Sequence, residues 1–156
     1  MDEYLPIDVE MMGRALGLAR LAGGMGEVPI GAVVYNHETG VVLAQAHNRR
    51  EVDNDPLAHA EVLAIRAAAR VLGDWRLEGL TRAVTLEPCP LCAGAIVNSR
   101  LGRVVFGASD PKAGACGTLM RLTEDARLNH RTTPIGGLMA EESAVLLRGF
   151  FARLRG

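Results

Sequence analysis

The chain has 156 residues, of which 49% are hydrophobic and 22% charged, so a disordered or fibrous protein is excluded and about one domain is expected. Its formal net charge of −1 argues against the strongly basic balance common in nucleic-acid-binding proteins. No apolar run reaches the roughly 18 residues that cross a bilayer, and no secretory signal pattern opens the chain. We therefore expect residues 1–156 to form a single cytoplasmic domain.

The first half of the chain predicts a helix, a hairpin and a second helix. Apolar residues recur at helical spacing from residue 8 to about residue 23, where two glycines end the run. Residues 29–35 and 41–47 are β-rich and are joined by a turn-like segment, which predicts a hairpin. Alanine-rich residues 57–72 then predict a helix that a glycine ends.

Helices and strands continue to alternate in the second half. The predicted strands cover residues 83–86, 104–107 and 135–138. Helical patterns cover residues 88 to about 98, 118–128 and 141–154. This alternation favours a layered α/β sheet with helices on both faces.

Two short motifs place metal-ligating residue types at the starts of predicted helices. They are His59-Ala60-Glu61 and Pro88-Cys89-Pro90-Leu91-Cys92. Unpaired N–H groups at a helix start stabilise thiolates and carboxylates. Two cysteines three residues apart can bind one ion from a single turn, and a histidine from a second helix adds a third ligand. Since no further motif supplies an evident fourth ligand, the set fits a catalytic zinc site that keeps one position for water.

Glu61 stands two residues after His59. On a regular helix it projects about 200° away from the histidine, although an irregular first turn would bring it round. A carboxylate that does not ligate, but lies beside a metal-bound water, can take the proton of that water and give it to a ring nitrogen. Zinc lowers the pKa of such a water toward roughly 7, so hydroxide is available at neutral pH.

These motifs and the segments around them resemble the bacterial tRNA-specific adenosine deaminases, a family of the zinc-dependent cytidine/deoxycytidylate deaminase superfamily. The His-x-Glu and Pro-Cys-x-x-Cys core indicates only the superfamily, whereas the flanking strings favour this family. The resemblance runs from about residue 8 to 155, with shared strings at residues 27–33, 47–49, 55–61, 85–95, 104–108, 117–120, 129–131 and 150–153. It implies a three-layer α/β/α cytidine-deaminase-like fold, with a central mixed sheet of about five strands.

The resemblance also implies the reaction and its partners. The family converts the wobble adenosine of an arginine tRNA to inosine by hydrolysis and releases ammonia. His59, Cys89 and Cys92 would hold one zinc ion per subunit, and Glu61 would move protons from the water to N1 of the purine and to the departing ammonia. The implied partners are a tRNA anticodon stem-loop, with its base extruded, and a second copy of the chain in a homodimer. No membrane partner is expected.

Further residues match the substrate contacts of the family. The resemblance implies that Asn48 hydrogen-bonds the base, that Val28, Ala60 and Leu86 line its pocket, that Asp110 lies near a ribose, and that Phe151 lies near neighbouring nucleotides. Arg50 and His47 depart from the family pattern at the rim of this pocket. These departures concern substrate affinity more than the chemistry.

Other interpretations of the same residues stay open. A deaminase of a free base or nucleoside, such as guanine, cytosine or cytidine, would share the core motif. A zinc module without catalytic activity, which binds nucleic acid or protein, would have no need of Glu61. The third cysteine, Cys116, is expected as a free, semi-buried thiol. Glu87 is expected as a supporting or helix-capping carboxylate rather than an acid catalyst.

The near-neutral net charge conceals an uneven distribution. Residues 1–99 carry eight arginines against 13 acidic residues, a net charge of −5, whereas residues 100–156 carry nine cations against five acidic residues, a net charge of +4. Sixteen of the 17 cations are arginine, the side chain best suited to bidentate phosphate contacts. We therefore expect an RNA that is held locally, with non-specific binding that salt weakens.

Overall fold

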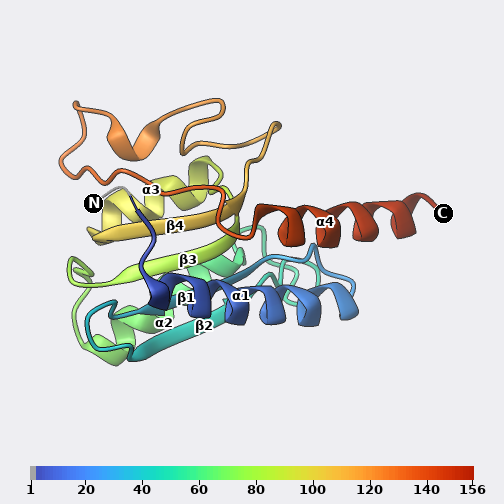
Figure 1. Ribbon diagram of the computed structural model, residues 1–156, viewed down its shortest axis with the longest axis horizontal. Helices are drawn as coiled ribbons and strands as arrows, with labels where there is room; N and C mark the ends of the chain where they lie inside the picture. Colours follow the sequence, from blue (N-terminus) through green and yellow to red (C-terminus); the bar gives the residue numbers. More distant parts are fainter. Residues whose placement is uncertain (1–2) are drawn as a thin grey trace.

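The computed structural model describes residues 3–156 and forms one sheet of four strands between layers of helices (Figure 1). The strands are β1 (Gly31–Tyr35), β2 (Val42–His47), β3 (Thr81–Leu86) and β4 (Arg103–Ala108), in the spatial order β2-β1-β3-β4. β1 pairs antiparallel with both β2 and β3, whereas β3 and β4 are parallel. The expected mixed sheet is confirmed.

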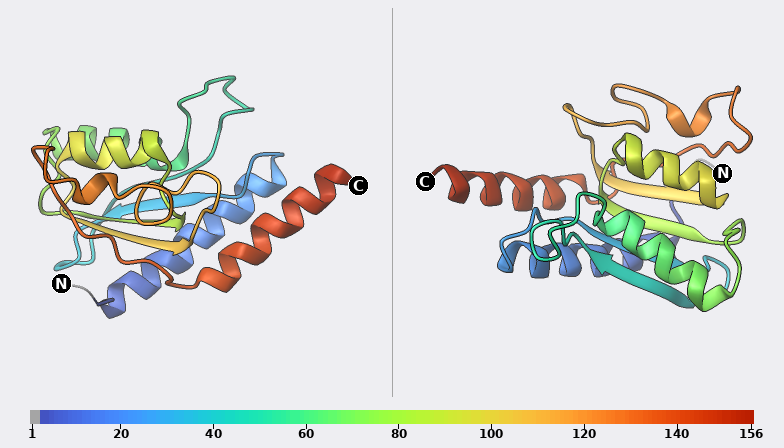
Figure 2. Two further views of the ribbon diagram at one scale, coloured as in Figure 1. Left: turned by 90° about the horizontal axis from the view of Figure 1, so that it is seen from above. Right: turned by 180° about the vertical axis from the view of Figure 1, so that it is seen from behind.

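Helices cover both faces of the sheet, as the three-layer prediction requires. They are α1 (Pro6–Gly24), α2 (Ala60–Leu72), α3 (Pro90–Ser99) and α4 (Ala140–Arg155). α1 and α4 run side by side on one face, and α2 and α3 cover the other (Figure 2). α4 projects past the end of the sheet where β3 and β4 finish (Figure 2). Within the described residues, no helix has the length and apolar character needed to cross a membrane.

Each face of the sheet has its own apolar core because alternate strand residues point to opposite faces. Val34 of β1 packs in the core beneath α2 and α3, whereas its neighbour Val33 packs beneath α1. α2 meets the sheet through a stripe of small side chains that recur every four residues, Ala60, Ala64 and Ala68. The Ala-rich sequence thus gives a helix that lies close to the strands.

Two of the predicted elements are much shorter in the structure than the sequence predicts. The strand expected at 135–138 is reduced to an isolated bridge between Ile135 and Val105, so the sheet has four strands rather than about five. The backbone N–H groups of Gly137 and Leu138 still donate to the carbonyl oxygens of Gly107 and Phe106, but the φ of 91° at Gly137 interrupts the extended conformation of a regular strand. The helical pattern at 118–128 yields only a short 3-10 helix, Leu122–Glu124.

A buried carboxylate ties α1 to the sheet. Asp8 is fully buried, and it accepts a hydrogen bond of 2.6 Å from the Tyr35 hydroxyl and two, of 2.9 and 3.1 Å, from the Arg103 guanidinium. Burial raises the pKa of Asp8, but the hydrogen bonds, led by that from Arg103, outweigh burial and hold the pKa below its usual value. The ionised carboxylate therefore stabilises the folded state.

We expect Asp8→Asn to lower the free energy of unfolding by about 3 kcal/mol at pH 7, because Arg103 then lacks its counter-charge in a largely buried position. The contribution of Asp8 is present above its unfolded pKa of 3.8 and is lost as pH falls through the lowered folded value. Urea denaturation across this pH range should show the two proteins converging in acid. Glu141→Gln, which removes an exposed ion pair with Arg148, is the control and should cost under about 1 kcal/mol. Equal stability of Asp8→Asn and the unmodified chain at pH 7 would contradict this account.

Candidate active site

Two helix starts bring the three predicted ligands together. His59 is the residue before α2, and Cys89 is the residue before α3, with Cys92 in the first turn of α3. Both helices run away from the end of the sheet where β3 finishes, and the strands that follow them return to it (Figure 2). Pro90 at the first position of α3 fits a helix start, where no backbone donor is needed. The order of the elements along the chain therefore places a histidine and two thiols at one point.

The three ligand atoms have the spacing of a metal site. The Nδ1 atom of His59 lies 3.4 Å from the Cys92 Sγ and 3.6 Å from the Cys89 Sγ, and all three atoms lie within 4.8 Å of one another. Tetrahedral bonds of about 2.0 Å to nitrogen and 2.3 Å to sulfur would put these atoms about 3.6 Å apart. The described residues therefore hold a His/Cys/Cys cluster that fits one metal ion, and Cys116 lies outside it.

Hydrogen bonds within the cluster shift the pKa values of the two thiols in opposite directions. The bond with the Cys92 thiol, followed by that with His59, holds the pKa of Cys89 well below its usual value. The hydrogen bond with Cys89, together with burial, raises the pKa of Cys92. The bond with Cys89 raises the pKa of His59. The lowered pKa of Cys89 favours its thiolate, the form of cysteine that binds metals.

Glu61 shares the cavity of the cluster. The sequence spacing puts Glu61 on the far side of a regular helix from His59, but His59 has extended backbone and stands outside α2, so the helical rotation does not apply. Only 4% of the Glu61 surface is exposed. Burial raises the pKa of the Glu61 carboxyl, although the positive charge of Arg82 opposes this. A carboxyl with a raised pKa is suited to take up and release a proton.

Arg82 is a feature of the site that the sequence analysis missed. It lies on β3, is fully buried, and its Nη2 atom is 3.7 Å from the Glu61 Oε2 atom. Within the described chain, its guanidinium nitrogens have no hydrogen-bond partner. A charged residue inside the apolar strand Thr81–Leu86 was the signal that could have indicated it.

A cavity of about 440 Å³ opens over the cluster. His59, Glu61 and Cys89 lie in its wall with four of the six residues expected at the substrate, namely Val28, Leu86, Asp110 and Phe151. Phe151 contributes to the cavity wall from the second half of α4. Glu87, expected as a supporting carboxylate, also lies in the wall, as does Arg50. Other lining residues, which sequence reasoning did not assign, are Ile30, Ser109, Pro111, Lys112, Ala113 and Leu147. The loop residues among them, 109 and 111–113, carry no periodic signal that would identify them.

The remaining two expected residues lie beside the cavity rather than in its wall. Asn48 is buried after β2, and its backbone N–H donates to the carbonyl oxygen of Ile30, which does line the cavity. Ala60 is fully buried in the core beneath α2. Asp110 lines the cavity, but its carboxylate also accepts backbone N–H bonds from Lys112 and Ala113.

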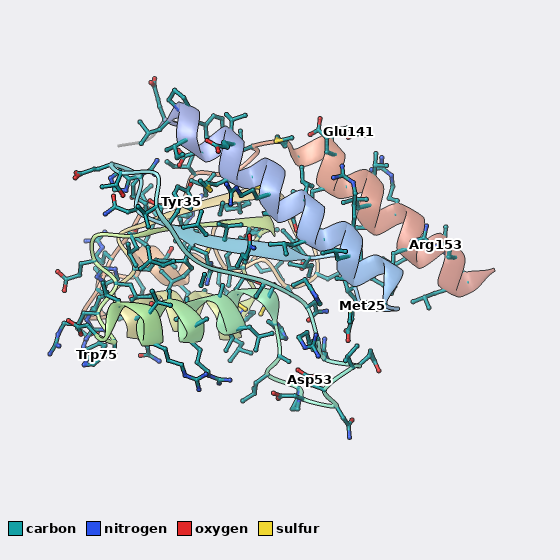
Figure 3. All side chains as sticks on the ribbon, turned by 90° about the horizontal axis from the view of Figure 1, so that it is seen from below. Met25, Tyr35, Asp53, Trp75, Glu141 and Arg153 are labelled. Carbon is teal, nitrogen blue, oxygen red and sulfur yellow. The ribbon has the colours of Figure 1, made fainter. Side chains whose placement is uncertain are left out.

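Four other residues considered from the sequence make hydrogen bonds or packing contacts and do not join the metal cluster. A ring nitrogen of His130 lies 2.8 Å from the carbonyl oxygen of Leu101, and one of His47 lies 3.0 Å from that of Asn48. Cys116 is buried and belongs to the apolar core. Trp75, at the far end of α2 from the cluster, packs its ring against the guanidinium groups of Arg76 and Arg100 (Figure 3).

Known proteins share these features. A deaminase family described as MafB19-like deaminase matches residues 8–155. The tRNA-specific adenosine deaminase of Bacillus subtilis is 51% identical over 144 residues, which cover 92% of this chain and 88% of the relative. A solved structure from work on A-to-I editing by tRNA:A34 deaminases at the wobble position is 43% identical, with a TM-score of 0.84, and covers 88% of this chain and 99% of its own.

A guanine deaminase from Bacillus subtilis is similar at a greater distance. It is 33% identical, with a TM-score of 0.61, and the match covers 94% of this chain and 93% of that protein. The likeness to the tRNA:A34 deaminase is therefore closer in both sequence and structure. The chain belongs to the family of the tRNA-specific adenosine deaminases.

Proposed function

We propose that this chain hydrolyses adenosine to inosine at the wobble position of a tRNA anticodon loop. The observation that carries the proposal is the buried Glu61 in one cavity with the His/Cys/Cys cluster. A structural metal site has no need of a carboxylate there, so this arrangement favours an enzyme over a binding module. The family of the chain supports adenosine in tRNA as the substrate.

We propose that His59, Cys89 and Cys92 hold one zinc ion. A donor set of one imidazole and two thiolates suits zinc, and three protein ligands leave a fourth position open. A zinc ion held there would supply Lewis-acid activation of the attacking water. The protein would supply the proton transfers and the shape of the cavity.

In the proposed mechanism, Glu61 moves two protons. One water proton passes to the Glu61 carboxylate and then to N1 of the purine, while the water oxygen bonds to C6. The second proton of the water passes by the same carboxylate to the amino nitrogen, and the C6–N bond breaks. The products, inosine and ammonia, account for all atoms of adenosine and water. Burial raises the pKa of the Glu61 carboxyl, which suits a group that must accept a proton from water and then release it to the base.

The cavity walls suit a planar base extruded from RNA. Val28, Ile30 and Leu86 supply apolar contact surface, and Phe151, whose side chain is 42% exposed, stands where a neighbouring nucleotide could stack. We propose that the Asn48 side chain hydrogen-bonds the base. The backbone N–H of Asn48 donates to the carbonyl oxygen of Ile30, a residue that lines the cavity, so Asn48 lies next to the cavity wall. We also propose that Ala60 supports the pocket floor and that Asp110 lies near a ribose.

Basic residues support RNA as the macromolecule that presents the base. Lys112 and Arg50 line the cavity, and α4 carries Arg148, Arg153 and Arg155. We propose a tRNA anticodon stem-loop, that of an arginine tRNA, as the partner, and a cytoplasmic location goes with this substrate. A homodimer is also proposed, and it would cover some of the exposed apolar side chains, among them Leu57, Leu91, Leu119 and Met120.

Deamination of a free base is the second candidate. Its specific support is the structural likeness to a guanine deaminase, and a cavity of about 440 Å³ has room for a free purine. Both candidate reactions use Glu61 and the metal cluster. They differ only in whether the base that enters the cavity belongs to an RNA or is free. A substrate comparison separates them.

We expect inosine to form in a stem-loop RNA that carries an adenosine at the wobble position, and Glu61→Gln to slow this reaction by about 10²–10⁴-fold because the proton relay is lost. Nucleoside analysis by mass spectrometry measures the inosine, and a stem-loop with guanosine at that position is the control. Ammonia from free guanine, with no inosine from the RNA, would contradict the proposal and establish the second candidate.

Metal content gives a separate prediction. The purified chain should contain about one zinc ion, and Cys92→Ser should remove most of it, because the cluster then keeps only two good ligands. Cys116→Ser should retain zinc, since Cys116 lies outside the cluster. Elemental mass spectrometry of the purified proteins checks both. Equal zinc loss in the two variants would show that the ligand set is wrong.

A further inference from the structure

Two loops contribute residues to the cavity wall. Residues 49–58 connect β2 to α2 and carry Arg50, whereas residues 109–121 follow β4 and carry the lining residues 109–113. Figure 3 shows Asp53 on a loop that projects from the body of the fold. Exposed loops of this kind are mobile unless specific bonds order them. What holds them therefore decides whether the cavity is already formed before substrate binds.

Glu27 holds the first loop. Its side chain is fully buried, and its two carboxylate oxygens accept backbone N–H bonds from Glu51 at 3.1 Å and from Val52 at 2.6 Å. Within the described chain, no other hydrogen bond joins residues 50–54 to anything outside 49–55. The loop is thus attached to the fold through one carboxylate.

Glu87 holds the second loop with a larger set of bonds. Its exposed fraction is 2%, and it accepts backbone N–H bonds from Asp110, Cys116 and Thr118 at 3.0, 3.1 and 3.0 Å. The Thr118 hydroxyl also donates to it at 2.5 Å. One bonded residue, Asp110, lies within the cavity-lining segment 109–113 and the other two follow it, so one carboxylate holds this segment to the part of the loop after it.

The loop backbone at Gly114 lies directly against the Glu87 carboxylate. A Cβ atom added at Gly114 would lie 2.5 Å from the Glu87 carboxylate, closer than van der Waals contact allows. Glycine at this position therefore lets the loop backbone approach the carboxylate and donate to it. Ionised carboxylates that accept several backbone donors make strong bonds, since each bond is charge-assisted.

We propose that Glu27 and Glu87 are positioning residues that preform the substrate cavity by holding these two loops before RNA binds. Glu87 also lies in the cavity wall, but both of its carboxylate oxygens are occupied by donors of the loop, so its proposed role is positioning and not proton transfer. Each residue spares the substrate the free-energy cost of ordering a loop, so each increases affinity rather than the rate of the chemical step. This proposal rests on the proposed function only for the identity of the substrate.

Hydrogen exchange measured by mass spectrometry tests the loops without any substrate. Glu87→Gln presents an amide N–H₂ group to backbone donors, so we expect amides at 110–118 to exchange at least about tenfold faster while those at 49–55 do not change. Glu27→Gln should give the reverse pattern. Glu38→Gln, the same change at an exposed side chain in the turn between β1 and β2, is the matched control and should alter neither loop.

Kinetics with the stem-loop RNA provide the second arm. Each loop variant should raise KM by about tenfold and keep kcat within about threefold, with zinc content unchanged. Gly114→Ala, which keeps both carboxylates but displaces Glu87, should reproduce the effect of Glu87→Gln in the 110–118 segment.

Unchanged exchange in the loop that faces the altered carboxylate, or faster exchange spread evenly over the chain, would overturn the proposal. So would a loss confined to kcat. Should the unmodified chain form no inosine, the proposed function fails, whereas the exchange experiment still decides whether the carboxylates hold the loops.

Discussion

The site depends on one constraint, which is that α2 and α3 begin at the same end of the sheet. Each helix starts directly after a residue with extended backbone, His59 or Cys89, so the ligand side chains point into the space between the two helix starts. The distances of 3.4 and 3.6 Å from His59 to the two sulfur atoms follow from this convergence. Because two helices and a strand fix these atoms, the cluster is formed by the fold and not by a flexible loop.

Four buried carboxylates surround or support the site that this convergence of helices creates. Asp8 ties α1 to the sheet, Glu61 stands in the cavity, and Glu27 and Glu87 hold two loops of its wall. Burying an ionised group is costly unless it is well paired, and three of these four accept several hydrogen bonds. Glu61 is the exception, since its Oε2 atom has no hydrogen-bond partner in the described chain. This unpartnered oxygen belongs to the residue for which proton transfer is proposed.

The sequence predicts the local features well and the remote contacts poorly. His59, Cys89 and Cys92 stand in short motifs at helix starts, so both their residue types and their positions are visible before folding. The contact of Gly114 with Glu87 and the approach of Arg82 to Glu61 join residues about 20 or more positions apart, and no periodicity encodes them. The segment expected as a strand at 135–138 does hydrogen-bond to β4, but it forms only the isolated bridge of Ile135 with Val105, because the apolar run alone does not specify a regular ladder with a distant strand.

The central claim is that the fold presents three ligands and leaves a fourth position open for the reaction. X-ray absorption at the zinc edge of the metal-loaded protein tests this most directly. The account predicts two sulfur neighbours at about 2.3 Å and two lighter neighbours, nitrogen or oxygen, at about 2.0–2.1 Å. Three sulfur neighbours, which would require Cys116 as a ligand, would mean a closed structural site and would contradict the account.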